Sequence, residues 1–353
     1  RDPAYNANFS LRAGEGFALE KNDLSWHPLQ GSLPRVLAFV TDQQAAGYSR
    51  LIHPFKALLE AGHVEGAAVS SLLSPVEIER LAPTTVVLQR PLDDAGLLAM
   101  SRLRAFSKVF TVYDLDGYLP QMELKGDYSA DELLERLRLG MMQADRVLVA
   151  TPALAELLQG QHDDIRVLES LLPAGWGRVQ SKRRMGARPR LGWLGGKDAQ
   201  LLADVLPALA DEVEWVVLGD CPESLQPFLA ELHPGVEQQQ LAVALAALNL
   251  DLALVPMAET LGNACSADLR VLQHAACGHP VICSRVPGFV GGEVLPLSRV
   301  SNQAQDWIRA IRLHLEDREA SATLGDALQS TVRAQWLLEG ERLDAWRRAW
   351  LAN

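Results

Sequence analysis

The sequence predicts an α/β protein made of two doubly wound, Rossmann-like domains that face each other across a cleft. From Pro34 onward, short β-branched or apolar runs alternate with longer segments of helical period, a pattern typical of βαβ units and parallel sheets. The alternation stops over residues 173–190 and then starts again. A chain of 353 residues is also longer than a single hydrophobic core usually organises, so two domains are expected.

The first domain is expected over residues 34–172, behind an N-terminal extension over residues 1–33. Its strand-like runs cover residues 35–40, 66–71, 84–90, 108–116 and 145–151, and its clearest helical segments cover residues 49–62 and 131–144. Strands that alternate with helices in this way pair in parallel, so these runs are expected to form one doubly wound sheet.

The stretch over residues 173–190 interrupts the alternation and is predicted to be a linker. It contains the sequence GWG and a basic cluster made of Lys182, Arg183, Arg184, Arg188 and Arg190. The second domain is expected over residues 191–302. Its strand-like runs cover residues 190–196, 213–219, 251–256 and 280–284, and its helical segments cover residues 198–210, 222–232, 241–248 and 268–277.

The tail over residues 303–353 has apolar residues at helical spacing, among them Trp307, Ile311, Trp336 and Trp346. Such spacing is typical of helices that bury one face. We expect these C-terminal helices to pack across the two domains as braces.

Composition excludes several classes of function. A net charge of −11 argues against a nucleic-acid partner, because binding along phosphates needs a basic surface. The four cysteines lie in or beside apolar segments, as reduced thiols of cytoplasmic proteins do. Residues 1–30 lack both a signal-peptide core and an initiator methionine, so we expect a piece of a longer multidomain chain. The expected location is the cytoplasm, with peripheral association at the inner face of the membrane kept open.

A paired glycine, Gly195 and Gly196, ends the predicted strand at residues 190–196. Without side chains, such a turn lets the backbone approach a phosphate ahead of a helix N-terminus. Glycines also occupy strand-to-helix turns for purely steric reasons, and the GxGxxG dinucleotide pattern is absent. Both interpretations stay open on the local pattern alone.

A polar segment precedes and enters the predicted helix at residues 268–277. Asn263, Ser266 and Asp268 lie near its start, while Arg270 and Gln273 follow within its first turns. A bound anion there would meet the helix dipole and the guanidinium together. In the alternative interpretation, Ser266 or Asp268 caps the helix and Arg270 is solvated. His274 and His279 are expected to pack in the interior.

The segment DLALVPMAETLGNACSADLRVLQHAACGHPVICSRVPGF, residues 251–289, resembles the donor-binding motif of GT-B glycosyltransferases. The resemblance is to the bacterial O-antigen and surface-glycan group, with a glycosyltransferase family 4-like C-terminal domain. The residues in register are Asn263, Asp268, Leu269, Arg270, Gly278 and Pro280. LGWLGG, TVVLQRPL, VYDLDGYLP and ADRVLVATPALAELL are similar to further segments of that group, so the resemblance covers most of residues 35–350.

The resemblance implies a GT-B architecture and a nucleoside diphosphate sugar as donor, without a metal or other cofactor. Arg270 would stand in for a lysine that holds the donor diphosphate, and Gly195 with Gly196 would add backbone N–H groups. Ser266 and Ala267 stand where the motif has a lysine-serine pair, and Gln273 stands where a glutamate usually binds the ribose. A fixed cation beside the departing nucleotide would stabilise the transition state.

Asp114 and Asp116 end a predicted strand, where side chains at i and i+2 share a face. Three interpretations remain: a shared divalent cation, acceptor hydroxyl binding with one carboxylate as a base, or capping of the turn before Gly117. Arg50 and His53 lie at a loop-to-helix junction after the first strand, where Arg50 would contact the acceptor and His53 would act as a general base. Tyr118 is assigned to the acceptor side.

The predicted function is therefore transfer of a sugar from a nucleoside diphosphate donor to a glycan, a lipid-linked glycan or a protein. The alternative is a catalytically inactive GT-B-like module that serves as a scaffold or binding domain in a larger glycan-assembly protein.

Overall fold

A computed structural model describes residues 33–41, 45–118, 128–182, 188–286, 289 and 294–352. The chain divides into two compact units: unit 1 comprises residues 1–170 and 338–353, and unit 2 comprises residues 171–337. Apart from Leu33, the expected N-terminal extension lies outside the described residues, as do Arg183 and Arg184 of the expected linker.

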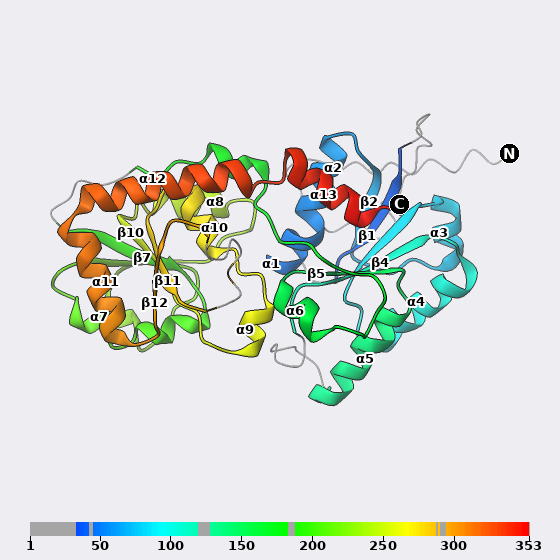
Figure 1. The fold of residues 1–353 in the computed structure, drawn as a ribbon, viewed down its shortest axis with the longest axis horizontal. Coiled ribbons are helices and arrows are strands. Elements are labelled where there is room, and N and C mark those ends of the chain that lie inside the picture. The colour runs from blue at the N-terminus through cyan, green and yellow to red at the C-terminus, as the bar shows by residue number, and fades with distance from the viewer. Residues whose placement is uncertain are drawn as a thin grey trace. The chain divides into compact units, whose positions relative to one another are not determined.

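Unit 1 is built around a six-stranded parallel sheet in the order β2-β1-β3-β4-β5-β6 (Figure 1). Its strands are β1 (Arg35–Phe39), β2 (Glu65–Val69), β3 (Thr85–Gln89), β4 (Phe110–Leu115), β5 (Arg146–Val149) and β6 (Ile165–Val167). Its helices are α1 (Ala45–Gly47), a π-helix (Tyr48–Ile52), α2 (His53–Glu60), α3 (Pro75–Leu81), α4 (Asp94–Phe106), α5 (Ala130–Met142), α6 (Pro152–Leu157) and α13 (Gly340–Trp350). All five residues of β3 are buried, as expected for a central strand covered by helices on both faces.

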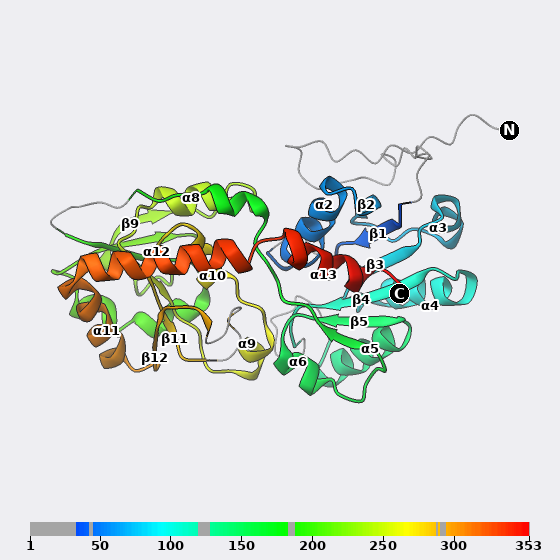
Figure 2. The same ribbon diagram turned by 45° about the horizontal axis from the view of Figure 1, so that its top comes forward.

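The C-terminal helix α13 belongs to unit 1, where it packs beside α2 (Figure 2). Arg146 of β5 holds the end of this helix: its Nη1 donates to the carbonyl oxygens of Ala349 (2.7 Å) and Leu351 (2.9 Å). The preceding helices of the tail, α11 (Ala304–Glu316) and α12 (Arg318–Gln335), lie in unit 2.

Unit 2 contains a second six-stranded parallel sheet, in the order β12-β11-β10-β7-β8-β9. Its strands are β7 (Arg190–Leu194), β8 (Glu214–Leu218), β9 (Leu229–His233), β10 (Leu252–Val255), β11 (Val281–Ser284) and β12 (Ser298–Val300). Besides α11 and α12, its helices are α7 (Val205–Ala208), α8 (Leu241–Ala247), α9 (Leu261–Cys265), α10 (Arg270–Ala276) and 3-10 turns over Ala174–Arg178, Lys197–Leu202 and Gln226–Phe228. Helices α8, α10 and α12 pack together, and α7 packs against α11.

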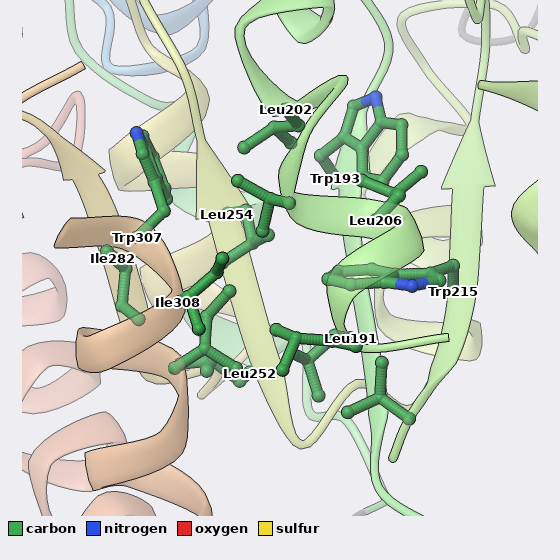
Figure 3. Close-up of a cluster of buried hydrophobic side chains, with 14 of the residues drawn as sticks. Leu191, Trp193, Leu202, Leu206, Trp215, Leu252, Leu254, Ile282, Trp307 and Ile308 are labelled. Carbon is green, nitrogen blue, oxygen red and sulfur yellow. The ribbon is translucent and has the colours of Figure 1, made fainter. Parts of the chain in front are cut away.

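One apolar cluster fills the space between this sheet and helices α7 and α11 (Figure 3). Leu191 and Trp193 point to the same face because they lie two residues apart on β7. Trp193 packs edge-on against Trp215 from β8, and Trp307 from α11 belongs to the same cluster; all four side chains are at most 1% exposed. Burial of large aromatic side chains contributes much of the stability of such a core.

Two secondary-structure predictions for unit 2 were wrong. The segment at residues 222–232 is not a helix, because it forms a short 3-10 turn and then the edge strand β9. The segment at residues 198–210 is divided between a 3-10 turn and the four-residue helix α7. Pairing with β8 provides β9 with backbone hydrogen bonds that its local sequence does not reveal.

Among the residues that the structure describes, no helix combines the length and the apolarity needed to cross a lipid bilayer.

Candidate functional site

The strand order of unit 2 reverses between β7 and β10, and both strands end at the same edge of the sheet. Gly195 and Gly196 follow β7, and Pro256 follows β10. Ligands of doubly wound sheets bind in the crevice at such a reversal point, beyond the carboxyl ends of the strands. The topology therefore marks this edge as the candidate ligand site.

The two positions of the turn require glycine for different physical reasons. A Cβ on Gly195 would lie 2.5 Å from both the amide nitrogen and the carbonyl oxygen of Asp220, so close backbone packing excludes any side chain. Gly196 has a φ of 156°, which other residues rarely adopt. A Cβ on Gly196 would lie 3.3 Å from Nη1 of Arg270. The structure thus brings Arg270 and the glycine turn together.

One expected role of this turn needs correction. The Gly195 N–H donates to the Leu218 carbonyl oxygen (2.8 Å), and the Gly196 N–H donates to the Asp220 carbonyl oxygen (3.3 Å). Both groups were expected to bind a diphosphate, but the end of β8 and the loop after it already use them. The turn therefore lies close beside Arg270 but does not provide two free backbone donors.

Arg270 is the first residue of α10, and its guanidinium lies between the ends of β7 and β10. Its Nε and Nη2 donate to the carboxylate of Asp268, with a shortest distance of 2.6 Å, and Nη2 also donates to the Pro256 carbonyl oxygen (3.2 Å). Within the described part of the chain, Nη1 has no hydrogen-bond partner, and the side chain is 17% exposed. Arg270 can therefore offer Nη1 to a ligand beside Gly196.

Asp268 holds Arg270 in place. Its carboxylate accepts the Arg270 backbone N–H (2.8 Å) as well as the guanidinium. Burial disfavours the charged form of Arg270, but the nearby carboxylates of Asp268 and Asp198 outweigh this effect and raise its pKa above the usual value. The guanidinium is thus fixed in the charged state, and Asp268 acts as its counterion and as a cap for its N–H group.

Asn263 links α9 to the segment that follows the glycine turn. Its Nδ2 donates to Asp198 (3.1 Å) and to the Ala258 carbonyl oxygen (2.8 Å), and Thr260 caps its helix. Asp198 lies two residues after Gly196 and influences Arg270, yet the sequence analysis did not include it. Its position two residues after Gly196 could have indicated that Asp198 lies in the site.

Ser266 and Gln273 occupy the surroundings of this cluster. Ser266 is half-buried at the end of α9, where its N–H donates to the Asn263 carbonyl oxygen (3.2 Å). Gln273 is half-buried on α10, three residues after Arg270 and so on the same side of the helix. Their expected contacts with a donor stay predictions.

In unit 1, Asp114 and Arg50 form a completely buried ion pair. The Arg50 guanidinium binds both carboxylate oxygens, at 3.0 and 2.8 Å, and Nη1 donates to the Leu168 carbonyl oxygen. Burial raises the pKa of Asp114, and the charge of Arg50 opposes that rise. The expected roles of Asp114 in catalysis and of Arg50 in acceptor binding therefore need correction, because both side chains are 0% exposed and bound to each other.

Asp116 binds a different arginine from Asp114, although its charge is near enough to contribute to the raised pKa of Asp114. It lies just beyond the end of β4, and its carboxylate accepts a 2.7 Å hydrogen bond from Nε of Arg90. Each of the two carboxylates thus has its own arginine. Among the described residues, no group of three or more His, Cys, Asp or Glu side chains is placed to hold a metal ion.

His53 begins α2 and is half-buried, with its ring centroid 5.4 Å from that of Tyr48. Burial and the nearby charge of Lys56 lower its pKa to about 4. A histidine with this pKa is neutral at pH 7 but only weakly basic, which disfavours its expected role as a general base. Tyr118 is half-buried just after β4, and its acceptor role stays a prediction.

The sheet of unit 1 has its own reversal point, between β1 and β3, and sequence analysis missed the polar residues there. The Thr41 N–H donates to the buried side chain of Gln89 (3.0 Å), and the Thr41 hydroxyl donates to the Gln89 carbonyl oxygen (3.0 Å). Arg90 follows with a φ of 31°, an uncommon value for a residue with a side chain. The position of these polar residues at or just after the ends of apolar strand-like runs could have indicated that they lie at the reversal point.

No protein-family model matches the sequence, and no curated protein matches it at the sequence level. Solved structures are nevertheless similar along most of the chain. Sucrose-phosphate synthase from Thermosynechococcus elongatus has a TM-score of 0.66 and 15% identity, and the match covers 89% of this chain and 97% of that one. A glycosyltransferase from Rickettsia africae has a TM-score of 0.65 and 12% identity, with 90% and 99% covered.

HepE from Anabaena, solved in complex with UDP and glucose, has a TM-score of 0.59 and 13% identity, with 89% and 97% covered. The TM-scores show a common fold, whereas identities of 12–15% are too low to transfer chemistry from these proteins to this chain. Two parallel six-stranded sheets with flanking helices, matched over nearly the whole length, confirm the predicted fold class: the chain has the GT-B fold of these glycosyltransferases.

Proposed function

We propose that the chain is a glycosyltransferase that uses a nucleoside diphosphate sugar, and that the donor diphosphate binds unit 2 beside Arg270 and Gly196. The observation that carries the proposal is the position of Arg270. Its guanidinium contacts the end of β10 through Pro256 and lies beside the turn after β7, so it spans the reversal point of the sheet.

The proposed chemistry breaks the bond between the anomeric carbon and the diphosphate oxygen of the donor. The oxygen of an acceptor hydroxyl forms the new bond and loses its proton, while negative charge grows on the departing nucleoside diphosphate. A fixed guanidinium stabilises this charge without having to reorganise during the reaction. Because Asp268 already holds Nε and Nη2, the proposed contact to the diphosphate comes from Nη1.

The finer parts of the proposal rest on the sequence resemblance. The acceptor is a glycan, a lipid-linked glycan or a protein, and the reaction needs no metal. The chain is grouped with the bacterial surface-glycan glycosyltransferases and is assigned to the cytoplasm, which agrees with its four free cysteines. HepE was solved with UDP-glucose, which makes UDP-sugars the first donors to test.

Calorimetric titration with UDP, GDP and dTDP tests the donor site, in the wild type and in Arg270→Met. A charge-assisted hydrogen bond contributes about 1.5–3 kcal/mol, so the variant should bind the preferred nucleotide roughly ten- to hundredfold more weakly. Arg318→Met is the matched control, because Arg318 pairs with Asp251 before β10, at the opposite edge of the same sheet. Equal affinity in wild type and Arg270→Met would refute the site.

Release of nucleoside diphosphate from a sugar donor then separates an enzyme from the inactive alternative. Binding without any release, across a panel of acceptors, would favour the scaffold. The same assay with a chelator tests whether the reaction needs a metal. Undiminished release of nucleoside diphosphate supports a metal-free reaction, and loss of release contradicts it.

A further inference from the structure

Two histidines lie completely buried in unit 2, behind Arg270. His274 is on α10, and His279 precedes β11. Their ring centroids are 5.5 Å apart, and their Nδ1 atoms are 3.3 Å apart, within hydrogen-bond distance. Neither residue belongs to the proposed donor contacts, so a pair of imidazoles in an apolar interior calls for another role.

The contacts of His274 fix its protonation. The backbone N–H of Leu194 points to His274 Nε2 at 3.3 Å, and an N–H donor needs an unprotonated acceptor. His274 is therefore neutral, with its proton on Nδ1, from which it donates to His279. Burial, followed by the neighbouring His279 and Arg270, lowers the pKa of His274 well below its ordinary value, which keeps the ring in this state.

Leu194 is the last residue of β7 and directly precedes the glycine turn. Helix α10 thus contacts this strand end at two points one helical turn apart. His274 holds Leu194, and Arg270 lies beside Gly196. The hydrogen bond that the strand end donates to the helix fixes the separation between the guanidinium and the turn.

From this geometry we infer that His274 is a positioning residue of the donor site: its Nε2 holds the end of β7 so that the turn at Gly196 stays beside Nη1 of Arg270. The inference rests on the proposed function and adds to it a residue that never touches the donor. Substrate-positioning residues of this kind act by pre-organising the groups that do.

The test uses UDP, GDP and dTDP with three variants. His274→Leu removes the acceptor, and we expect nucleotide affinity to fall about five- to tenfold, the effect of one lost hydrogen bond. His274→Gln places a carbonyl oxygen near the position of Nε2, and affinity should return to within about twofold of wild type. His314→Leu is the control, because His314 is a buried histidine of the same unit that bonds Ser298 and Ser321 instead.

Hydrogen exchange of the Leu194 amide provides a second measurement, made on the chain without nucleotide. It should be slow in the wild type and in His274→Gln, and faster in His274→Leu if that variant folds. A rapidly exchanging amide in the wild type would overturn the inference before any variant is made.

The remaining outcomes separate the two proposals. Equal affinity in His274→Leu and wild type, an equal loss in His274→Gln, or an equal loss in His314→Leu would each overturn the positioning role while leaving the donor site intact. A wild type that binds none of the three nucleotides, with a protected Leu194 amide, would instead overturn the proposed function and with it the inference.

Discussion

The Asp114→Asn variant should destabilise unit 1 severely, because it leaves the Arg50 guanidinium buried without a counterion. Both side chains are 0% exposed, and the guanidinium also lies 4.9 Å from the ring centroid of Trp346 on α13. Removing one partner of a buried ion pair costs about 3–5 kcal/mol. With a urea dependence of roughly 2 kcal/mol per molar, the unfolding midpoint of unit 1 should fall by about 1.5–2.5 M.

The double variant Asp114→Leu with Arg50→Met sharpens the prediction. Replacing both charges with apolar groups removes the cost of a buried unpaired ion, so the double variant should be more stable than either single charge deletion. The assay is urea unfolding, followed by hydrogen exchange in peptides of β1, β4 and α13. Asp94→Asn is the control, since Asp94 pairs with Arg136 but is 89% exposed, and its loss should not shift the midpoint measurably.

One result would refute the reasoning. If Asp114→Asn unfolded at the wild-type urea concentration but lost sugar transfer, the carboxylate would act in the reaction and not in the interior. The same measurement therefore decides between the catalytic role expected from the sequence and the structural role assigned by the contacts.

Two further predictions concern unit 2. A hydrogen bond from Arg190 lowers the pKa of Glu231 to about 2 from 4.5, so Glu231 stabilises unit 2 fully above about pH 4.5 and loses this effect as the pH falls toward 2. Because its side chain is 39% exposed, we expect only about 1 kcal/mol, and Glu231→Gln should flatten acid unfolding in that range. Gly195→Ala should destabilise unit 2 by about 1–3 kcal/mol, because its Cβ would overlap backbone atoms. Gly175→Ala is the control and should change stability little, because its Cβ would meet nothing within 4 Å. Equal melting temperatures of the two variants would contradict the steric explanation.

The central strands were predictable from the sequence for a physical reason. A parallel strand covered on both faces must be apolar throughout, and runs such as residues 84–90 stand out from their surroundings for that reason. The edge strand β9 was not predictable, because none of its residues is fully buried and its composition resembles that of a helix. Its conformation comes from pairing with β8, which no local window of sequence contains.

In the candidate site, too, some features could be predicted from the sequence and others could not. The placement of Arg270 beside the glycine turn follows from topology, because both lie at strand ends of one doubly wound sheet. The use of the Gly195 N–H by Leu218 depends instead on pairing with the end of the neighbouring strand β8. The pairing of Arg50 with Asp114 joins residues 64 positions apart, and neither residue type shows from its surroundings that it will be buried.

The Asp268 carboxylate changes what Arg270 can do in the proposed donor site. Two of the three guanidinium nitrogens are held by it, so the pair carries no net charge and attracts an anion less strongly than a lone arginine would. In exchange, the guanidinium cannot rotate, and its remaining nitrogen keeps one direction toward Gly196. A fixed N–H group stabilises a transition state whose negative charge develops at one point more than it stabilises a bound anion whose charge is spread out. Asp268 therefore suits a site that stabilises a departing diphosphate better than one that stores it.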